Sequence, residues 1–185
     1  MECGENMVTI IICGSKKDEV IAKTLYKVLC RYGKVYHDKV YEPIRVVSHT
    51  SFYISEVEHI PESNASNGIL IFKNTFEKSD NSIIPNNFTI IMDPQNTEAA
   101  QAIKGTNNVV ITCGMLMKST LSISSLDFSS AIISVQRSIT DLSSKLIEPH
   151  DFAVLLRNKM GVYPILAVSA ALMMLGVPSS SGYEF

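Results

Sequence analysis

The stretch Met7–Cys30, MVTIIICGSKKDEVIAKTLYKVLC, decides the fold that the sequence predicts. Its apolar run Val8–Cys13 predicts a buried strand, and Gly14 follows directly. Asp18–Arg31 then predicts a helix that Gly33 stops, because its apolar residues recur at spacings of three and four. These apolar residues are Val20, Ile21, Leu25, Val28 and Leu29. A strand, a Gly-containing loop and a helix form the arrangement in which nucleotide-binding proteins hold a phosphate.

Further apolar runs predict more strands before Gly114. They are Lys34–Tyr36, Ile44–Val47, Gly68–Asn74, Phe88–Asp93 and Asn108–Gly114. Ser51–Gly68 predicts a strand or a short helix followed by a loop, and Asn96 predicts the cap of a helix that ends at Gly105. Buried strands that alternate with helices predict a mostly parallel sheet flanked by helices, so the predicted fold class is α/β.

The pattern changes after Gly114. Ser119–Leu156 shows partial alternation and short polar turns, which predicts a late β-meander of three antiparallel strands. Val162–Leu175 predicts a helix that is apolar on nearly every side, and such a helix must be covered all round. Either the meander or a second copy of the chain supplies this cover, so we predict a homodimer that buries the helix or the edge of the sheet. Residues 179–185 predict a frayed tail.

Composition limits the class of function. At 185 residues, with 46% hydrophobic and 18% charged residues, the chain suits a single domain over 1–185. A formal net charge of −2 with scattered basic residues argues against a nucleic-acid partner. The apolar run Val162–Pro178 is shorter than the roughly 20 residues that span a bilayer, and Pro164 interrupts it, so no membrane span is expected.

The chain has four cysteines: Cys3, Cys13, Cys30 and Cys113. None is in a C-x-x-C pair, and no histidine lies at metal-ligand spacing from one, so no metal site is predicted. The first residues are acidic and lack the long apolar stretch of a secretory signal. Unpaired cysteines and the missing signal predict a cytoplasmic protein, and no cofactor is expected.

Three segments, taken in order, resemble the central, ATP-binding domain of the Mur ligases and folylpolyglutamate synthases. VTIIICGSKKDEVIAKTLYKVLCRYGKV, residues 8–35, matches the first strand, phosphate loop and long helix of that family. FTIIMDPQNTEAAQAIKGTNNVVITCGM, residues 88–115, resembles its strand that ends in Asp-Pro and the helix and strand that follow. NKMGVYPILAVSAALMMLGVP, residues 158–178, resembles its late helix, which opens with a G-x-H-N-x-x-N motif. The resemblance implies a P-loop-like fold of this central-domain type, without the flanking domains of the family.

The phosphate loop departs from the family pattern G-T-x-G-K-T-T. Aligned on Gly14, this chain has Lys17, Asp18 and Glu19 where the resemblance places Gly, Lys and Thr. A carboxylate about 4 Å from a phosphate charge is repelled by roughly 4 kcal/mol at an effective dielectric constant of 20. Acids in this position instead suit the first turn of the helix, where the helix dipole favours them.

The late motif has changed as well. The resemblance places its His and two Asn on Met160, Gly161 and Pro164. Two parts of one ATP site are therefore missing, which favours a non-catalytic binding or interaction module whose partner is a protein or a small ligand. The alternative is an ATP-dependent ligase-like enzyme of cell-wall or folate type with an altered phosphate loop.

No residue is predicted to be catalytic. Candidates for binding an anion beside the helix N-terminus are Gly14, Ser15, Lys16 and Lys17. Two solvated lysines are the alternative explanation of Lys16 and Lys17. Asp93, Cys113 and Gly114 follow neighbouring strands, so they are predicted to lie at the edge of a pocket where α/β proteins bind ligands. For Cys113 a position in the core is the alternative.

Overall fold

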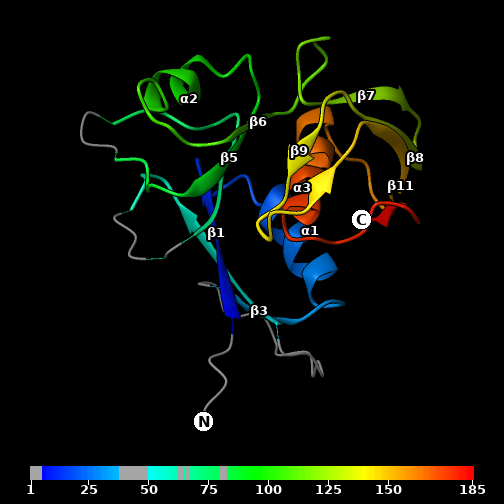
Figure 1. The fold of residues 1–185 in the computed structure, drawn as a ribbon, viewed down its shortest axis with the longest axis horizontal. Coiled ribbons are helices and arrows are strands. Elements are labelled where there is room, and N and C mark those ends of the chain that lie inside the picture. Colours follow the sequence, from blue (N-terminus) through cyan, green and yellow to red (C-terminus); the bar gives the residue numbers. More distant parts are fainter. Residues whose placement is uncertain (1–5, 38–49, 62–64, 66, 80–82) are drawn as a thin grey trace.

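The computed structural model describes residues 6–37, 50–61, 65, 67–79 and 83–185, so the predicted strand Ile44–Val47 lies outside the described residues. A six-stranded sheet forms the centre, with strand order β2-β3-β1-β4-β5-β6 and parallel pairing throughout (Figure 1). Its strands are β1 (Asn6–Cys13), β2 (Lys34–His37), β3 (Thr50–Val57), β4 (Gly68–Phe72), β5 (Phe88–Met92) and β6 (Val110–Thr112). The parallel sheet predicted from the apolar runs is confirmed, and the ambiguous segment after Ser51 is a strand.

Helices cover both faces of this sheet. Because side chains alternate along a strand, Ile10 and Ile12 face α1 (Val20–Leu29) and α3 (Val162–Met174), while Ile11 and Cys13 face the other way. The opposite face packs against α2 (Thr97–Ala102) and the loops around it. Helices α1 and α3 lie side by side in Figure 1. The two faces therefore have separate apolar cores.

The helix ends differ slightly from their prediction. Helix α1 begins at Val20 rather than Asp18, and its first turn contains no acid. Glu19 is the N-cap residue, but its side chain pairs with Lys23 at 2.5 Å instead of capping a backbone N–H. In α2 the Asn96 side chain accepts a hydrogen bond from the Ala99 N–H at 3.0 Å, as its cap position predicts.

A second sheet has strand order β12-β11-β8-β7. Strands β7 (Leu121–Leu126), β8 (Ser130–Val135) and β11 (His150–Leu155) pair antiparallel, which confirms the meander. Between β8 and β11, β9 (Ile139–Thr140) and β10 (Leu146–Ile147) form a separate hairpin. The frayed tail was a wrong prediction, because β12 (Tyr183–Glu184) adds in parallel to β11 and the Tyr183 ring packs edge-on against Phe152.

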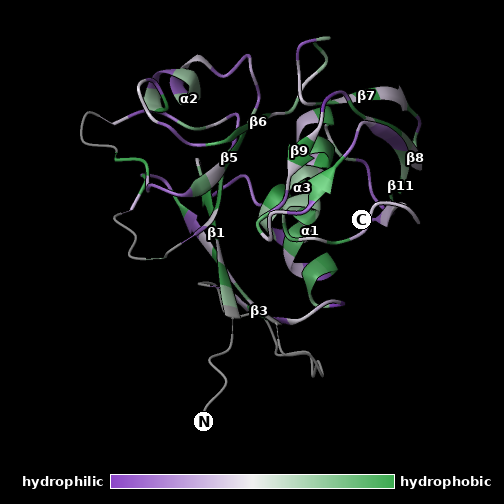
Figure 2. Cartoon of the chain, in the orientation of Figure 1, coloured by the Kyte–Doolittle hydropathy of each residue, from purple (hydrophilic) through white to green (hydrophobic). Residues whose placement is uncertain are grey.

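Helix α3 is buried on every side by its own chain. Hydrophobic residues are concentrated along it in Figure 2, and Ile165 to Met174 are all buried. It packs against α1, β4, β5 and β7, so the central sheet and the meander together supply the cover. The need for a second copy to cover this helix was therefore a wrong inference, and the predicted homodimer rests on the sheet edge alone.

No helix within the described residues is both long enough and apolar enough to cross a membrane.

Candidate functional site

The candidate site lies where the parallel strands end at their carboxyl termini. The loop from Gly14 to Glu19, here called the phosphate loop because of its position, connects β1 to α1. Lys73 directly follows β4, which is the neighbour of β1 in the sheet. Segments 13–15 and 73–75 are joined by hydrogen bonds, because Lys73 N–H donates to the Cys13 carbonyl at 2.8 Å. This arrangement brings the Lys73 side chain underneath the phosphate loop.

The Lys73 ammonium is fully buried and occupies the inside of the phosphate loop. Its Nζ donates to the Ser15 carbonyl at 3.0 Å and to the Asp18 carbonyl at 2.5 Å. A third bond goes to Glu56 Oε1 at 2.7 Å. An ammonium group has three N–H donors, so these three acceptors use all of them. The positive charge is thus compensated by residues of the protein itself.

Glu56 and His37 extend this buried charge cluster along the sheet. Both side chains are almost fully buried, and His37 Nε2 lies 3.9 Å from Glu56 Oε2. Glu56 lies on β3 and His37 on β2, which are adjacent strands. A buried charge is tolerated when it is paired and hydrogen-bonded, and Lys73 provides that pairing for Glu56.

The backbone N–H groups of the phosphate loop are also engaged within the protein. Gly14 donates to the Val57 carbonyl at 2.9 Å, and Ser15 donates to Thr75 Oγ1 at 3.1 Å. The N–H groups at positions 17 and 18 donate to the hydroxyl and the carbonyl of Ser15. A phosphate-binding loop holds its ligand through such N–H groups, and here four of them already have acceptors.

Gly14 has a structural explanation that needs no phosphate. Its φ of +143° is a conformation that side-chain-bearing residues rarely adopt. A Cβ at this position would lie 2.7 Å from Lys73 Cβ. The glycine therefore makes room for the lysine that fills the loop.

Tyr163, in the first turn of α3, reaches the same edge of the sheet. Its hydroxyl donates to the Phe72 carbonyl at the end of β4 and lies 3.5 Å from the Ile91 carbonyl of β5. Burial raises the pKa of this phenol well above its usual range, and Cys113, Asp93 and Asp18 add to the effect. The hydroxyl is thus a protonated donor that fastens α3 to the strand ends.

Two hollows remain open at the carboxyl edge. The first, about 350 Å³, lies between Asn74, Asp93, Gly114 and the start of α3 at Gly161–Tyr163. Asn74 Nδ2 is 3.4 Å from Asp93 Oδ2, which joins two of its walls. The second hollow, about 330 Å³, is lined by Gly14, Ser15, Glu58, His59, Thr75 and Glu77. Neither hollow has a lysine or arginine in its lining, so neither offers a phosphate a positive partner.

The predicted site residues divide between these features. Gly14 and Ser15 line the second hollow, whereas Lys16 and Lys17 are exposed outside it. Anion binding by these four residues stays a prediction. Asp93 and Gly114 line the first hollow, whereas Cys113 is fully buried and does not.

Two cysteine thiols lie near the site without being poised for chemistry. Burial raises the pKa of Cys13 to about 12, against a smaller opposing effect of the Lys73 charge. Burial also raises the pKa of Cys113, with a further contribution from Asp93. Both thiols therefore stay protonated near neutral pH, and a thiol is a poor nucleophile in that state. Within the described ranges, no three histidine, cysteine or acidic side chains are placed to hold a metal ion.

Sequence reasoning did not find Lys73 or Glu56. The only signal was a lysine immediately after the apolar run Gly68–Phe72, where a strand is still surrounded by the core. Glu56 had none, because it alternates with apolar residues as an exposed strand residue would.

Solved structures show what this fold is similar to. One is a murein peptide ligase Mpl from Psychrobacter arcticus 273-4, with a TM-score of 0.58 and 13% identity, covering 95% of this chain and 45% of that one. Another is the UDP-N-acetylmuramate:L-alanyl-gamma-D-glutamyl-meso-diaminopimelate ligase from Neisseria meningitides, with a TM-score of 0.58 and 15% identity, covering 93% and 63%. The chain thus spans about half of these ligases, and the likeness shows a Mur ligase-like fold. No protein-family model and no curated protein matches the sequence.

Proposed function

We propose that this protein is a non-catalytic binding or interaction module, built on a fold of the Mur ligase central-domain type whose ATP site has been replaced by internal contacts. The observation that carries the proposal is the buried Lys73 ammonium inside the phosphate loop. The proposal also places the module in the reducing cytoplasm, because the described cysteines, Cys13, Cys30 and Cys113, are all free thiols.

The charges around the phosphate loop oppose nucleotide binding. Lys73 uses its three donors on protein oxygens, so a phosphate would have to break these bonds before it gained any of them. Removing an ion-paired group from a buried partner costs about 3–5 kcal/mol. Asp18 adds repulsion, since a carboxylate about 4 Å from a phosphate charge costs roughly 4 kcal/mol at an effective dielectric constant of 20. The exposed Lys16 and Lys17 can offset only part of this through solvent-screened attraction.

One observation favours the alternative, an ATP-dependent ligase-like enzyme with an altered phosphate loop. The 350 Å³ hollow beside Asp93 is open and lies at the carboxyl edge of the strands, where α/β enzymes bind ligands. Such an enzyme must still bind the nucleotide. The two functions therefore differ in a single measurable property.

The test is a thermal shift panel with ATP, ADP and UDP-sugars, each with and without Mg²⁺. A nucleotide at about 100 times its dissociation constant stabilises the folded state by about 2.7 kcal/mol, which would raise the melting temperature by about 5–10 °C. We expect no shift with any of the nucleotides at millimolar concentration. A Mg²⁺-dependent rise with ATP would support the enzyme and reject the proposal.

A loop-restored variant separates the loop sequence from the internal lysine. Lys17→Gly, Asp18→Lys and Glu19→Thr together return the family's Gly-Lys-Thr. We expect this variant to remain without nucleotide binding while Lys73 is present, because the inside of the loop is still occupied. Binding by this variant would show that Lys73 does not close the site.

A further inference from the structure

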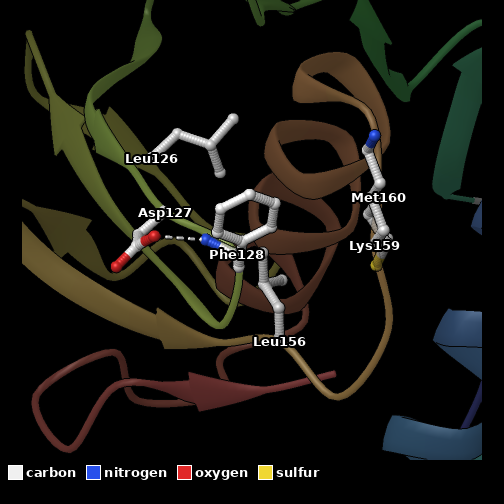
Figure 3. A pocket seen from close by; sticks show the side chains of 6 residues that line it. All are labelled: Leu126, Asp127, Phe128, Leu156, Lys159 and Met160. Carbon is white, nitrogen blue, oxygen red and sulfur yellow. Dashed lines mark hydrogen bonds between the residues drawn. The ribbon is translucent and has the colours of Figure 1, made fainter.

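Two hollows adjoin on a different surface of the protein, around the segment that connects β11 to α3. The first, about 230 Å³, has an apolar lining of Leu126, Phe128, Leu156 and Met160, which Figure 3 shows around the Phe128 ring. Phe128 lies in the tight turn between β7 and β8, and its N–H donates to Asp127 Oδ1 at 2.6 Å. Its side chain is 89% exposed, so the turn presents an aromatic ring that this chain does not cover.

The second hollow, about 240 Å³, continues from the first. It shares Lys159 and Met160 with the first hollow and runs along one stripe of α1. The α1 residues in its lining recur at helical spacing, so they share one face: Val20, Lys23, Thr24, Lys27, Val28 and Arg31, the last just beyond the helix. Together the two hollows form one groove, here called the basic groove. It shares no lining residue with the hollows at the carboxyl edge of the sheet.

The basic groove carries a positive excess in a protein whose formal net charge is −2. Its cationic lining residues are Lys23, Lys27, Arg31, Arg157 and Lys159, and its acidic lining residue is Asp127.

Two acids outside the lining neutralise part of this charge. Glu19 pairs with Lys23, and Glu184 pairs with both Arg157 and Arg31. Among the residues that the structure describes, Lys27 and Lys159 have no salt-bridge partner. These two ammonium groups flank the floor of the groove.

We propose that the basic groove docks an acidic peptide segment that carries an aromatic or branched aliphatic anchor. The anchor would occupy the hollow at Phe128, and the adjacent acidic residues would meet Lys159 and Lys27. This pairing of an apolar pocket with an unpaired positive rim is complementary to a segment of that composition in both charge and hydrophobicity. The inference rests on the proposed role as a binding module and gives that role a partner chemistry.

The shape of the surface favours a peptide over an anionic membrane. A membrane-binding surface presents a convex face with apolar residues that enter the lipid. Here the cations line the walls of two consecutive hollows instead, and Leu156 and Met160 lie inside the groove with Phe128 (Figure 3). An extended segment fits such a channel, and a lipid surface cannot follow it.

The test is fluorescence polarisation with a labelled twelve-residue peptide that contains Phe next to three Glu, using the full chain. The matched probes are the same peptide with Ser in place of Phe, and with Lys in place of each Glu. We expect saturable binding of the first peptide that weakens with salt, because exposed charges are screened. Both altered peptides should bind at least ten-fold more weakly. Equal binding of all three, or none, overturns the proposal.

Variants of the protein assign the binding to the groove. Lys27→Glu with Lys159→Glu is expected to weaken binding about ten-fold, the size of effect produced by reversing two exposed charge contacts. Phe128→Ser removes the apolar contact and should act similarly, whereas Lys104→Glu and Ile83→Ser change exposed residues elsewhere and should leave binding unchanged. A groove variant that binds like the wild type contradicts the assignment.

A vesicle arm and a nucleotide arm distinguish other causes. Co-sedimentation with phosphatidylserine vesicles that exceeds peptide binding would overturn the choice of a peptide. The nucleotide panel is independent of the groove, so a failure of peptide binding leaves the absence of ATP binding standing, and the reverse also holds.

Discussion

Lys73→Met is the perturbation that the buried site makes most informative. The side chain keeps similar volume and remains apolar along its length, but the ammonium and its three hydrogen bonds are lost. Glu56 is then left in the core without its closest cation, and His37 at 3.9 Å replaces that contact only in part. Breaking a buried ion pair from one side costs about 3–5 kcal/mol. For a domain whose total stability is typically 5–15 kcal/mol, this is a large fraction.

The expected loss corresponds to a fall in melting temperature of roughly 6–20 °C, at 2–4 °C for each kcal/mol in a chain of this size. Urea unfolding followed by far-ultraviolet circular dichroism measures the free energy of unfolding, since the chain has no Trp for fluorescence. Lys104→Met is the matched control. Because Lys104 is exposed, that change should stay within about 0.5 kcal/mol of the wild type.

A double variant tests whether the charge pairing causes the loss. Lys73→Met with Glu56→Gln removes both charges, and it should recover about 2 kcal/mol or more of what the single variant loses. If Lys73→Met is within about 1 kcal/mol of Lys104→Met, the lysine is not buried against Glu56 and the reasoning fails. If the double variant is no more stable than the single one, the pairing is not the cause.

Further predictions concern the same edge of the sheet. Gly14→Ala should cost about 1–3 kcal/mol in chemical unfolding, because it strains the backbone and its Cβ would lie 2.7 Å from Lys73 Cβ; an unchanged midpoint would contradict the loop geometry. Tyr163→Phe should lower the free energy of unfolding by about 1–2 kcal/mol, because the Phe72 carbonyl loses its hydroxyl donor; a neutral result in thermal unfolding would reject that bond. The raised pKa of Cys13, about 12, leaves about one thiol in a thousand ionised at pH 9, so labelling of the native protein by a disulfide reagent should be slow there and rise only as pH approaches 12; rapid labelling of Cys13 at pH 8, located by mass spectrometry, would disprove its burial. Sedimentation velocity at rising concentration should reveal a homodimer formed through the sheet edge, and a species that stays monomeric throughout would exclude it.

Local pattern was sufficient to predict most of the fold. The three consecutive isoleucines at 10–12 are buried on both faces of the sheet, and only a central parallel strand needs apolar residues on both sides. The meander followed from alternation, and α3 followed from an apolar circumference without a polar face. What covers α3 could not be predicted, because the cover comes from elements that are close in space and distant in sequence.

The candidate site was only partly predictable for the same reason. The substitutions at Lys17, Asp18 and Glu19 are visible in the sequence and argue against phosphate binding. The replacement is not visible, because Lys73 meets Ser15 across 58 residues and Glu56 across 17. A strand-terminal lysine is ordinarily solvated, and its burial depends on three acceptors that tertiary structure assembles.

The tail shows a related limit. Residues 179–185 are rich in Ser and Gly, which favours a disordered end by composition. Two aromatic residues override this, since Tyr183 packs against Phe152 and stacks with Phe185. Tyr183 OH also donates to the Val177 carbonyl at 2.8 Å. The segment is ordered by contacts that only the folded meander provides.

The central claim is that the phosphate loop holds the protein's own lysine in place of a nucleotide. Isothermal titration calorimetry with millimolar Mg-ATP tests it most directly, because it detects binding whether or not a reaction follows. The account predicts no saturable heat for the wild-type protein. A saturable titration with a micromolar dissociation constant, lost in the presence of excess ADP, would contradict it.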